Sequence, residues 1–398
     1  MGPLAGIKVI EFAHIMAGPV CGLMLADMGA DVIKVEKYPD GDDTRRTLQP
    51  NVDGESASFL MMNRNKRGIA LNLKSEAGRD IACKLLADAD VAVENYRKGT
   101  MERLGLGYDD VRAFNPGIVY AELSGFGRTG PYAERAGFDL IAQGMSGIMS
   151  VTGEGPGRPP TKCGAPLSDI TAGILAAMGV LGAVVHRERT GEGQRVDTSL
   201  YEAAITHTYW QSAMTFATGI SPGALGSAHP LSAPYQAFEA ADGWITIGAA
   251  NQSSWLRLLE AIERPELQDD PRFADDTARM ANIEDLVAML TDILRKRSAG
   301  EWLERMERAG VPAGPVLDIA GMQADPQTLA RGMVTEVPHT RVGPVKTLGH
   351  PVHYSATPAA ITRGAPLLGE HTVEVLTEHG YSEAEIEAFA AQGAVIIA

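Results

Sequence analysis

Residues 7–37 read IKVIEFAHIMAGPVCGLMLADMGADVIKVEK, and this stretch decides the fold class. Two short apolar runs, Ile7–Phe12 and Val32–Glu36, have the length and composition of buried strands. Between them Gly18–Met28 is apolar and ends at Gly29, which is typical of a helix C-terminus. A strand, a helix and a second buried strand in this order predict two parallel strands of one sheet.

The same alternation continues along the first half of the chain. Further strands are expected at Ile69–Leu73, Val91–Asn95 and Ile118–Ser124, and a helix at Ser75–Ala89 with Ser75 as its N-cap. A capping box, Ser199-Leu200-Tyr201-Glu202, predicts the start of another long helix. Strands that are apolar throughout are covered on both faces, so this part predicts a large, doubly wound, Rossmann-like α/β domain.

The pattern changes after about residue 225. Tyr235–Ala240 and Trp244–Ala249 flank Asp242-Gly243, which predicts an antiparallel hairpin, and helices are expected at 252–263, 282–297 and 300–309. Two final helices are expected near 369–379 and 382–392. We therefore expect a large domain in 1–224, a smaller α+β domain in 225–325, and a return segment in 326–398.

Composition excludes several classes of protein. The net charge of -15 argues against binding to nucleic acid or to an anionic membrane, although residues 31–103 hold as many basic as acidic residues. Cys21, Cys83 and Cys163 lack paired spacing, and the nine histidines lack metal-ligand spacing, so we expect reduced thiols, a cytoplasmic protein and no metal. No leader is evident, and the apolar run Ile170–Val185 is expected to be a buried core helix with no membrane segment.

Polar and basic residues follow the strands of the expected sheet. Because ligands of open parallel sheets bind outside the carboxyl ends of the strands, cations there suit a ligand that carries phosphate. The alternative, that they are solvated surface side chains, stays open. The residues concerned are His14, Lys37, Lys74, Asn95, Arg97, Lys98 and Arg103.

Two further features of the sequence each have two interpretations. Gly125–Gly130 matches GxGxxG, but it follows the fifth strand and precedes Pro131, which disfavours a nicotinamide site. Asp169 immediately precedes the apolar run at Ile170–Val185. A carboxylate there is either the N-cap of the helix or a catalytic acid, and in isolation the cap is the commoner case.

Seven segments, in order along the whole chain, resemble the family III CoA-transferases, which include formyl-CoA transferase and succinyl-CoA-dependent dicarboxylate transferases. They are Ile7–Pro19, Val32–Lys37 with Gly41-Asp42 and Arg45, Asn65-Lys66-Arg67, Val93-Glu94-Asn95, Gly193–Asp197, Val311–Val316 and Gly369–Thr372.

The resemblance implies an obligate homodimer of two interlocked chains, with the large domain of each built from both chain ends. Asp169 matches the nucleophile of the family, and acyl-CoA is implied as a substrate, with no permanently bound cofactor. Backbone amides around Gly248, together with Asn251, are candidates to stabilise oxyanions, and Arg45 or Arg46 could hold a distal carboxylate or lie only on a surface loop. The implied CoA-contacting positions are His14, Ile15, Met16, Lys37, Leu71, Lys74, Asn95, Arg103, Phe138 and Asp139.

The implied reaction moves CoA between carboxylic acids through an aspartyl anhydride and an aspartyl-CoA thioester, without ATP or a metal. Succinyl-CoA and a small dicarboxylate are the expected pair, whereas Ala136 and the loop Gly248–Gln252 depart from formyl-CoA transferase and argue against formate and oxalate. The alternatives are an α-methylacyl-CoA racemase, which Phe138 opposes because it cannot carry a proton, and a CoA-binding protein without catalysis.

Overall fold

The computed structural model of the chain describes residues 2–46 and 50–398, which form two compact units. The larger unit joins the chain up to Met149 with Lys162–Ser221 and Pro326–Ala398, so it uses segments from both halves of the sequence. The smaller unit joins Ser150–Thr161 with Pro222–Asp325. The limits expected from the sequence differ from this grouping chiefly at Ser150–Thr161, which belongs with the smaller unit.

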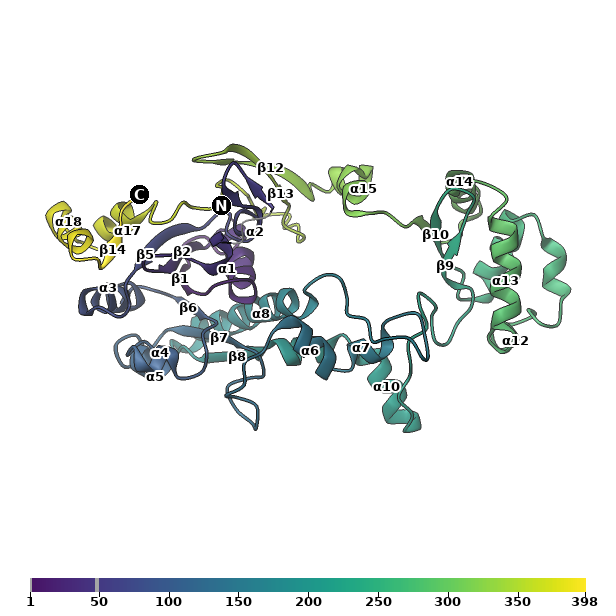
Figure 1. Ribbon diagram of the computed structural model, residues 1–398, viewed down its shortest axis with the longest axis horizontal. Coiled ribbons are helices and arrows are strands. Elements are labelled where there is room, and N and C mark those ends of the chain that lie inside the picture. The colour runs from purple at the N-terminus through teal and green to yellow at the C-terminus, as the bar shows by residue number, and fades with distance from the viewer. Residues whose placement is uncertain (1, 47–49) are drawn as a thin grey trace. The chain divides into compact units, whose positions relative to one another are not determined.

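A seven-stranded sheet forms the centre of the larger unit (Figure 1). Its order is β14-β5-β2-β1-β6-β7-β8, and all neighbours are parallel except β14 and β5. The strands expected from the sequence are confirmed, although the one expected at Ile69–Leu73 begins and ends two residues earlier. The bounds are β1 (Lys8–Phe12), β2 (Asp31–Lys37), β5 (Arg67–Leu71), β6 (Val91–Glu94), β7 (Val119–Ser124), β8 (Arg195–Ser199) and β14 (Val395–Ile396).

Alternate side chains of these strands enter two separate cores. Val9 and Val93 pack with α1, α6, α8 and α9 on one face, whereas Ile10 and Val35 pack with α3, α5, α17 and α18 on the other. The sheet is therefore doubly wound, as its uniformly apolar strands require. These helices are α1 (Ala17–Asp27), α3 (Glu76–Ala87), α5 (Tyr108–Phe114), α6 (Asp139–Met145), α8 (Leu167–Thr190), α9 (Leu200–Thr206), α17 (Thr372–Glu378) and α18 (Glu383–Ala391).

The strand order reverses at β1. The chain proceeds outward from β1 through β2 to β5, and then returns to the other side of β1 to form β6, β7 and β8. The carboxyl ends of β1 and β6 therefore flank a topological switch point, where adjacent loops leave the sheet in opposite directions and open a crevice.

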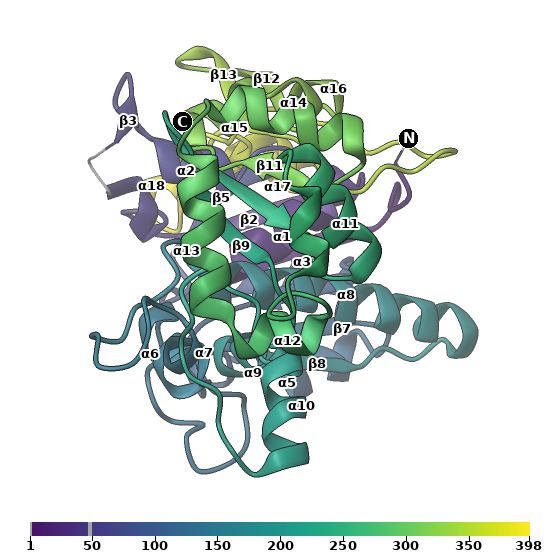
Figure 2. The same cartoon turned by 90° about the vertical axis from the view of Figure 1, so that its right-hand side faces the viewer.

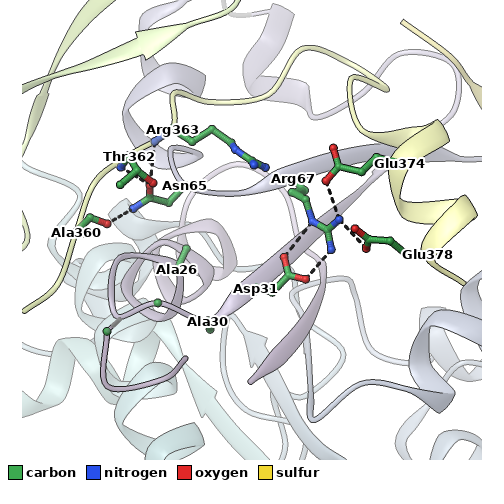
Figure 3. A pocket seen from close by; sticks show the side chains of 12 residues that line it. Ala26, Ala30, Asp31, Asn65, Arg67, Ala360, Thr362, Arg363, Glu374 and Glu378 are labelled. Carbon is green, nitrogen blue, oxygen red and sulfur yellow. Dashed lines mark hydrogen bonds and ion pairs between the residues drawn. The ribbon is translucent and has the colours of Figure 1, made fainter. Parts of the chain in front are cut away.

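The late part of the chain completes the other edge of this sheet. Helix α17, yellow in Figure 1, packs against β5, α18 packs against α17 and β14, and β14 pairs with Leu71 and Ala70. The buried guanidinium of Arg67 in β5 joins the two parts, since it donates to Asp31 in β2 and to Glu374 and Glu378 in α17 (Figure 3). Figure 3 shows these groups in the wall of a polar cavity of about 450 Å³.

Shorter elements complete the larger unit. A two-stranded ribbon pairs β12 with β13 antiparallel, and β3 pairs with β4 in the same sense. The bounds are α2 (Ala57–Met62), α4 (Thr100–Arg103), α7 (Ile148–Val151, where the chain passes to the smaller unit), α10 (Tyr209–Thr218), α16 (Pro326–Ala330), β3 (Asn51–Val52), β4 (Glu55–Ser56), β12 (Val334–His339) and β13 (Gly343–Leu348), with a 3-10 turn at Asp43–Arg46.

The smaller unit is built on the expected hairpin. Strands β9 (Tyr235–Glu239) and β10 (Trp244–Gly248) pair antiparallel across Asp242-Gly243, and β11 (Ala313–Pro315) adds a third strand. Helices α11, α13 and α14 pack against them around the buried Trp255 (Figure 2). The helices are α11 (Gln252–Ala261), α12 (Asp276–Ala281), α13 (Ile283–Leu294), α14 (Ala299–Ala309) and α15 (Ile319–Ala324), with a 3-10 turn at Pro265–Asp269.

Two sequence expectations about helices need correction. The helix after Ser199 is short: α9 ends at Thr206, and the hydroxyl groups of Thr206 and Thr208 donate to the carbonyls of Ala203 and Ile205, which favours a break before α10. The apolar helix α8 is longer than its apolar run and only partly buried. Its length and composition would suit a membrane span, but 44% of its most apolar window is buried, chiefly against α1 and the sheet.

Candidate active site

A cavity of about 720 Å³ opens at the switch point of the larger unit. Three loops that follow β1, β6 and β7 form most of its wall, and the start of α8 contributes Asp169. This is the position that an open, doubly wound sheet offers to a ligand. The main lining residues are His14, Ile15, Met16, Asp43, Asn95, Tyr96, Arg97, Lys98, Arg103, Ser124, Gly125, Arg135, Phe138 and Asp169.

Asn95 joins the two loops at the switch point. Its side-chain oxygen accepts the His14 N–H at 3.0 Å, and its side-chain nitrogen donates to the His14 carbonyl at 2.8 Å. The His14 ring stacks on Tyr96, with ring centroids 5.4 Å apart. Burial lowers the pKa of His14 despite the nearby carboxylates of Asp42 and Asp43, which favours a neutral imidazole at the cavity wall.

The backbone of Ile15 is strained and is held by buried charge. Its φ of 67° lies in the left-handed region, which is unfavourable for a β-branched residue. Asp42 accepts the Ile15 N–H at 3.1 Å, and Lys34 binds both Asp42, at 2.9 Å, and the carbonyl of Ala13, at 2.7 Å. Lys34 is fully buried and also pairs with Glu11 at 3.1 Å. A buried ionic network thus fixes the shape of the loop that enters the cavity.

Asp169 is the third residue of α8 and is half-buried. Pro166 occupies the N-cap position and has no side chain able to cap, so Asp169 is not the cap that its position in the sequence, taken alone, favours. The capping role falls to Asp139, whose Oδ1 accepts the N–H of Ser168 at 2.9 Å. Among the described residues, Asp169 has no side-chain hydrogen bond, so its carboxylate is available at the cavity wall.

The environment of Asp169 changes its acidity. Burial, with a smaller contribution from the negative charge of Asp139, raises the pKa of Asp169 to about 6. Desolvation destabilises the carboxylate, and the adjacent like charge adds to this effect. A partly desolvated carboxylate that is still ionised at neutral pH is a competent nucleophile, and perturbed acids in cavities are typical of catalytic sites.

The cations expected around the ligand divide into two groups. Arg97, Lys98 and Arg103 line the cavity, whereas Lys37 and Lys74 do not. Lys37 instead pairs with Asp43, which also lies 3.5 Å from His14. Leu71 is a core residue of β5 whose carbonyl accepts the Tyr38 N–H, so its side chain and carbonyl are both engaged. Asp139 binds Ser168 rather than forming part of the cavity wall.

Four further candidates are engaged elsewhere. Arg45 binds both carboxylate oxygens of Glu36 at 2.7 Å and the carbonyl of Pro366 at 2.8 Å, because its side chain turns inward over Phe59. Arg46 is exposed and pairs with Asp40. In the smaller unit the Gly248 N–H donates to Pro312 at 2.9 Å, and Asn251 caps α11 through the Ser254 N–H. The Gly248 amide is therefore not a free oxyanion donor in this structure.

The Gly125–Gly130 segment has a packing role. A Cβ on Gly125 would lie 2.7 Å from the Cα of Gly137, and one on Gly137 would lie 2.6 Å from the Cα of Gly125. The two backbones touch, which brings Phe138 to the cavity while Arg128 pairs with the buried Glu94 and binds the Tyr96 carbonyl. Gly125 therefore serves a close backbone approach, whereas Gly127 and Gly130, with φ of 89° and 81°, allow left-handed turns in the loop.

Sequence reasoning missed Gln143, Asp43 and Tyr96. Gln143 is fully buried and binds both Asp139 and the Cys163 N–H, but an isolated Gln in a short helix carries no signal of this role.

Among the described residues, no group of three or more His, Cys, Asp or Glu side chains is arranged to hold a metal ion. The site thus combines the half-buried carboxylate of Asp169 with a cavity wall that carries both cations and the carboxylates of Asp43 and Glu134.

Comparison with known proteins identifies the family. A model of CoA-transferase family III matches residues 4–372, and the chain belongs to that family. It is 39% identical over 382 residues to a succinate–glutarate CoA-transferase of Agrobacterium fabrum, in a match that covers 94% of this chain and 95% of the relative. It is 40% identical over 386 residues to an acetyl-CoA:oxalate CoA-transferase of Acetobacter aceti, with 96% and 97% covered.

The fold agrees with this assignment. The crystal structure of a CAIB/BAIF family protein from Brucella suis matches with a TM-score of 0.86 and 40% identity, over 95% of this chain and 99% of that one. The chain is therefore a family III CoA-transferase, an enzyme class whose substrates are CoA thioesters and carboxylic acids.

Proposed function

We propose that the enzyme transfers CoA from succinyl-CoA to a small dicarboxylate, with Asp169 as the covalent nucleophile. The observation that carries the proposal is the unpaired carboxylate of Asp169 in a cavity of about 720 Å³ whose wall also holds Arg97, Lys98 and Arg103. The cations suit the phosphates of CoA, and the carboxylate suits attack on its thioester. Relatives that act on succinate, glutarate and mesaconate support dicarboxylates as the acids.

In the first half-reaction the Asp169 carboxylate attacks the thioester carbonyl, forms a mixed anhydride and releases CoA thiolate. The thiolate attacks the aspartyl carbonyl, which forms aspartyl-CoA and releases succinate. In the second half the acceptor carboxylate attacks the aspartyl-CoA carbonyl, which forms a second mixed anhydride and expels CoA thiolate. The thiolate then attacks the acceptor carbonyl of that anhydride. The new thioester leaves and the Asp169 carboxylate is restored, so the thioester bond is conserved throughout.

The chain's own residues make these steps effectively intramolecular. The loop His14–Met16 is fixed by Asn95 and Asp42, and it borders the same cavity as Asp169. A thiolate whose nucleotide part stays bound in that cavity remains close to the aspartyl carbonyl, which raises its effective concentration. Phe138 lines the cavity and is 67% exposed, and its ring offers a surface for the acyl-CoA but no proton.

The test combines substrate and nucleophile. Purified enzyme is mixed with succinyl-CoA and glutarate, mesaconate or oxalate, and the acyl-CoA products are measured by mass spectrometry. We expect a new dicarboxylyl-CoA with equal release of succinate. Asp169→Asn is expected to abolish turnover, because its amide is a poor nucleophile. Unchanged turnover in that variant would disprove the role of Asp169. In a separate incubation with a chiral 2-methylacyl-CoA, epimerisation seen by chiral chromatography without CoA transfer would indicate a racemase instead.

We also propose that the enzyme works as an interlocked homodimer. Two helices of the larger unit expose large apolar side chains, a surface that isolated soluble chains rarely leave uncovered. They are Ile174 and Met178 on α8 and Tyr209, Trp210 and Phe216 on α10, with 47 to 88% of each exposed. Light scattering should give twice the chain mass of 42.3 kDa, and a monomer at micromolar concentration would contradict the proposal.

A further inference from the structure

The segment that leads into Asp169 is held by one helix. Residues 163–168 run from Cys163 to the start of α8, and within it Gly164 has no neighbouring atom near its Cβ position. Among the described residues, the hydrogen bonds from this segment's backbone to another element all end on α6: Cys163 on Gln143, Ser168 on Asp139, and a long contact of 3.5 Å between Ala165 and Gln143.

Gln143 and Asp139 act as one unit. Asp139 Oδ1 accepts the Ser168 N–H at 2.9 Å, and its Oδ2 accepts from Gln143 Nε2 at 2.7 Å. Gln143 Oε1 in turn accepts the Cys163 N–H at 2.8 Å. The two side chains lie one helical turn apart on α6, so both ends of the segment are bound to the same rigid element.

This series of hydrogen bonds requires an amide side chain at position 143. A backbone N–H needs an acceptor, and a carboxylate needs a donor, and the Gln side chain supplies one of each. Gln143 is 0% exposed, so no water replaces a lost partner at low cost. A glutamate side chain has the same shape but no donor at neutral pH, and it would place a second negative charge against Asp139.

We propose that Gln143 is a positioning residue for Asp169, acting through Asp139 and the 163–168 segment to fix where the nucleophile meets the thioester. This inference rests on the proposed function. Because covalent catalysis depends on near-attack geometry, displacement by about 1 Å costs about 10²-fold in rate. Binding of the substrate's nucleotide part does not depend on this segment. A change at Gln143 is therefore expected to lower kcat and to leave KM for acyl-CoA nearly unchanged.

The test is an amide–carboxylate exchange. Gln143→Glu is expected to lower kcat about 10²-fold with KM for acyl-CoA nearly unchanged. In the double variant Asp139→Asn, Gln143→Glu, the amide oxygen now at position 139 can accept from Ser168. Its nitrogen can donate to the carboxylate now at position 143, and that carboxylate can still accept from Cys163. The double variant is therefore expected to recover most of the lost kcat. The control is Gln392→Glu, the same change at an exposed helix end, with wild-type kcat expected.

A second readout does not depend on activity. Hydrogen exchange at the amides of Cys163 and Ser168 is expected to accelerate in Gln143→Glu and to return toward the wild-type rate in the double variant. Unchanged exchange and kcat in Gln143→Glu, or failure of the double variant to recover either, would overturn the inference. If exchange responds as expected while the wild-type enzyme transfers no CoA, the proposed function fails and the structural role of Gln143 stands.

Discussion

Asp139 caps the helix that carries Asp169, although the two residues are 30 positions apart in the sequence: its Oδ1 accepts the Ser168 N–H at 2.9 Å. Because Asp139 caps the helix, the Asp169 carboxylate does not have to accept a backbone N–H of the first helical turn. Asp139 also places a second negative charge near the nucleophile, and that charge contributes to its raised pKa.

The first prediction concerns pH. Because burial and Asp139 raise the pKa of Asp169 to about 6, kcat/KM should rise with pH through about 6 as the nucleophile ionises. Asp139→Asn removes the like charge and should move this limb to lower pH. Measurement of the pH–rate profiles of the wild type and the variant checks this. If kcat/KM rises at the same pH in both proteins, Asp139 does not affect the pKa of Asp169.

The same shift has a consequence for stability. The folded pKa of Asp169 lies above its ordinary value of 3.8, so ionisation opposes folding. Its contribution to stability is greatest below pH 4 and is lost as pH rises through about 6. Asp169→Asn should therefore raise the melting temperature relative to wild type at pH 8 more than at pH 4, and thermal melts at both values measure the difference.

A third prediction tests the buried ionic network under the His14–Met16 loop. Lys34→Met leaves Asp42 without its buried cation and Glu11 with Lys66 as its remaining buried partner, which should cost about 3 kcal/mol or more. Thermal or urea unfolding should show a large loss of stability. The control is Lys8→Met, which removes an exposed pair with Asp88 and should cost less than about 1 kcal/mol. Equal effects would contradict the role assigned to Lys34.

A fourth prediction concerns Asp43, which pairs with Lys37 and faces His14 at the cavity. The negative charge of Asp43 in the cavity wall repels the phosphates of CoA. Asp43→Asn should lower KM for acyl-CoA several-fold, most clearly at low salt. The matched control is Asp40→Asn, whose carboxylate pairs with the exposed Arg46 and does not line the cavity. A higher KM in Asp43→Asn would show that Asp43 supports binding.

The fifth prediction tests the contact between Gly125 and Gly137. Gly125→Ala would force its Cβ to within 2.7 Å of the Gly137 backbone, so the Phe138 segment must move and activity should fall sharply. The control is Gly300→Ala on α14, where a Cβ meets nothing within 4 Å and helix propensity favours Ala. Normal activity of Gly125→Ala would show that the loop tolerates displacement.

Much of the fold of the larger unit could be predicted from the sequence, because buried parallel strands are apolar throughout and their boundaries carry turn residues. His14 and Asn95 could be placed at one crevice for the same reason. The partners of Arg45 and Asp139 could not be predicted from the sequence. Glu36 lies 9 residues from Arg45 and Ser168 lies 29 residues from Asp139, and nothing in the local sequence specifies either contact. Buried Lys34 and Lys66 also resemble exposed lysines in a sequence, because their compensating acids come from other elements.

The position of β14 at the edge of the sheet affects how the protein is made. Leu71 in β5 cannot find its antiparallel partner, nor Arg67 its two glutamates, until residues beyond 370 have left the ribosome. The chain of the smaller unit is complete by residue 325, well before that point. During synthesis the internal unit can therefore fold first, while the edge of β5 remains open and needs protection from pairing with other nascent chains.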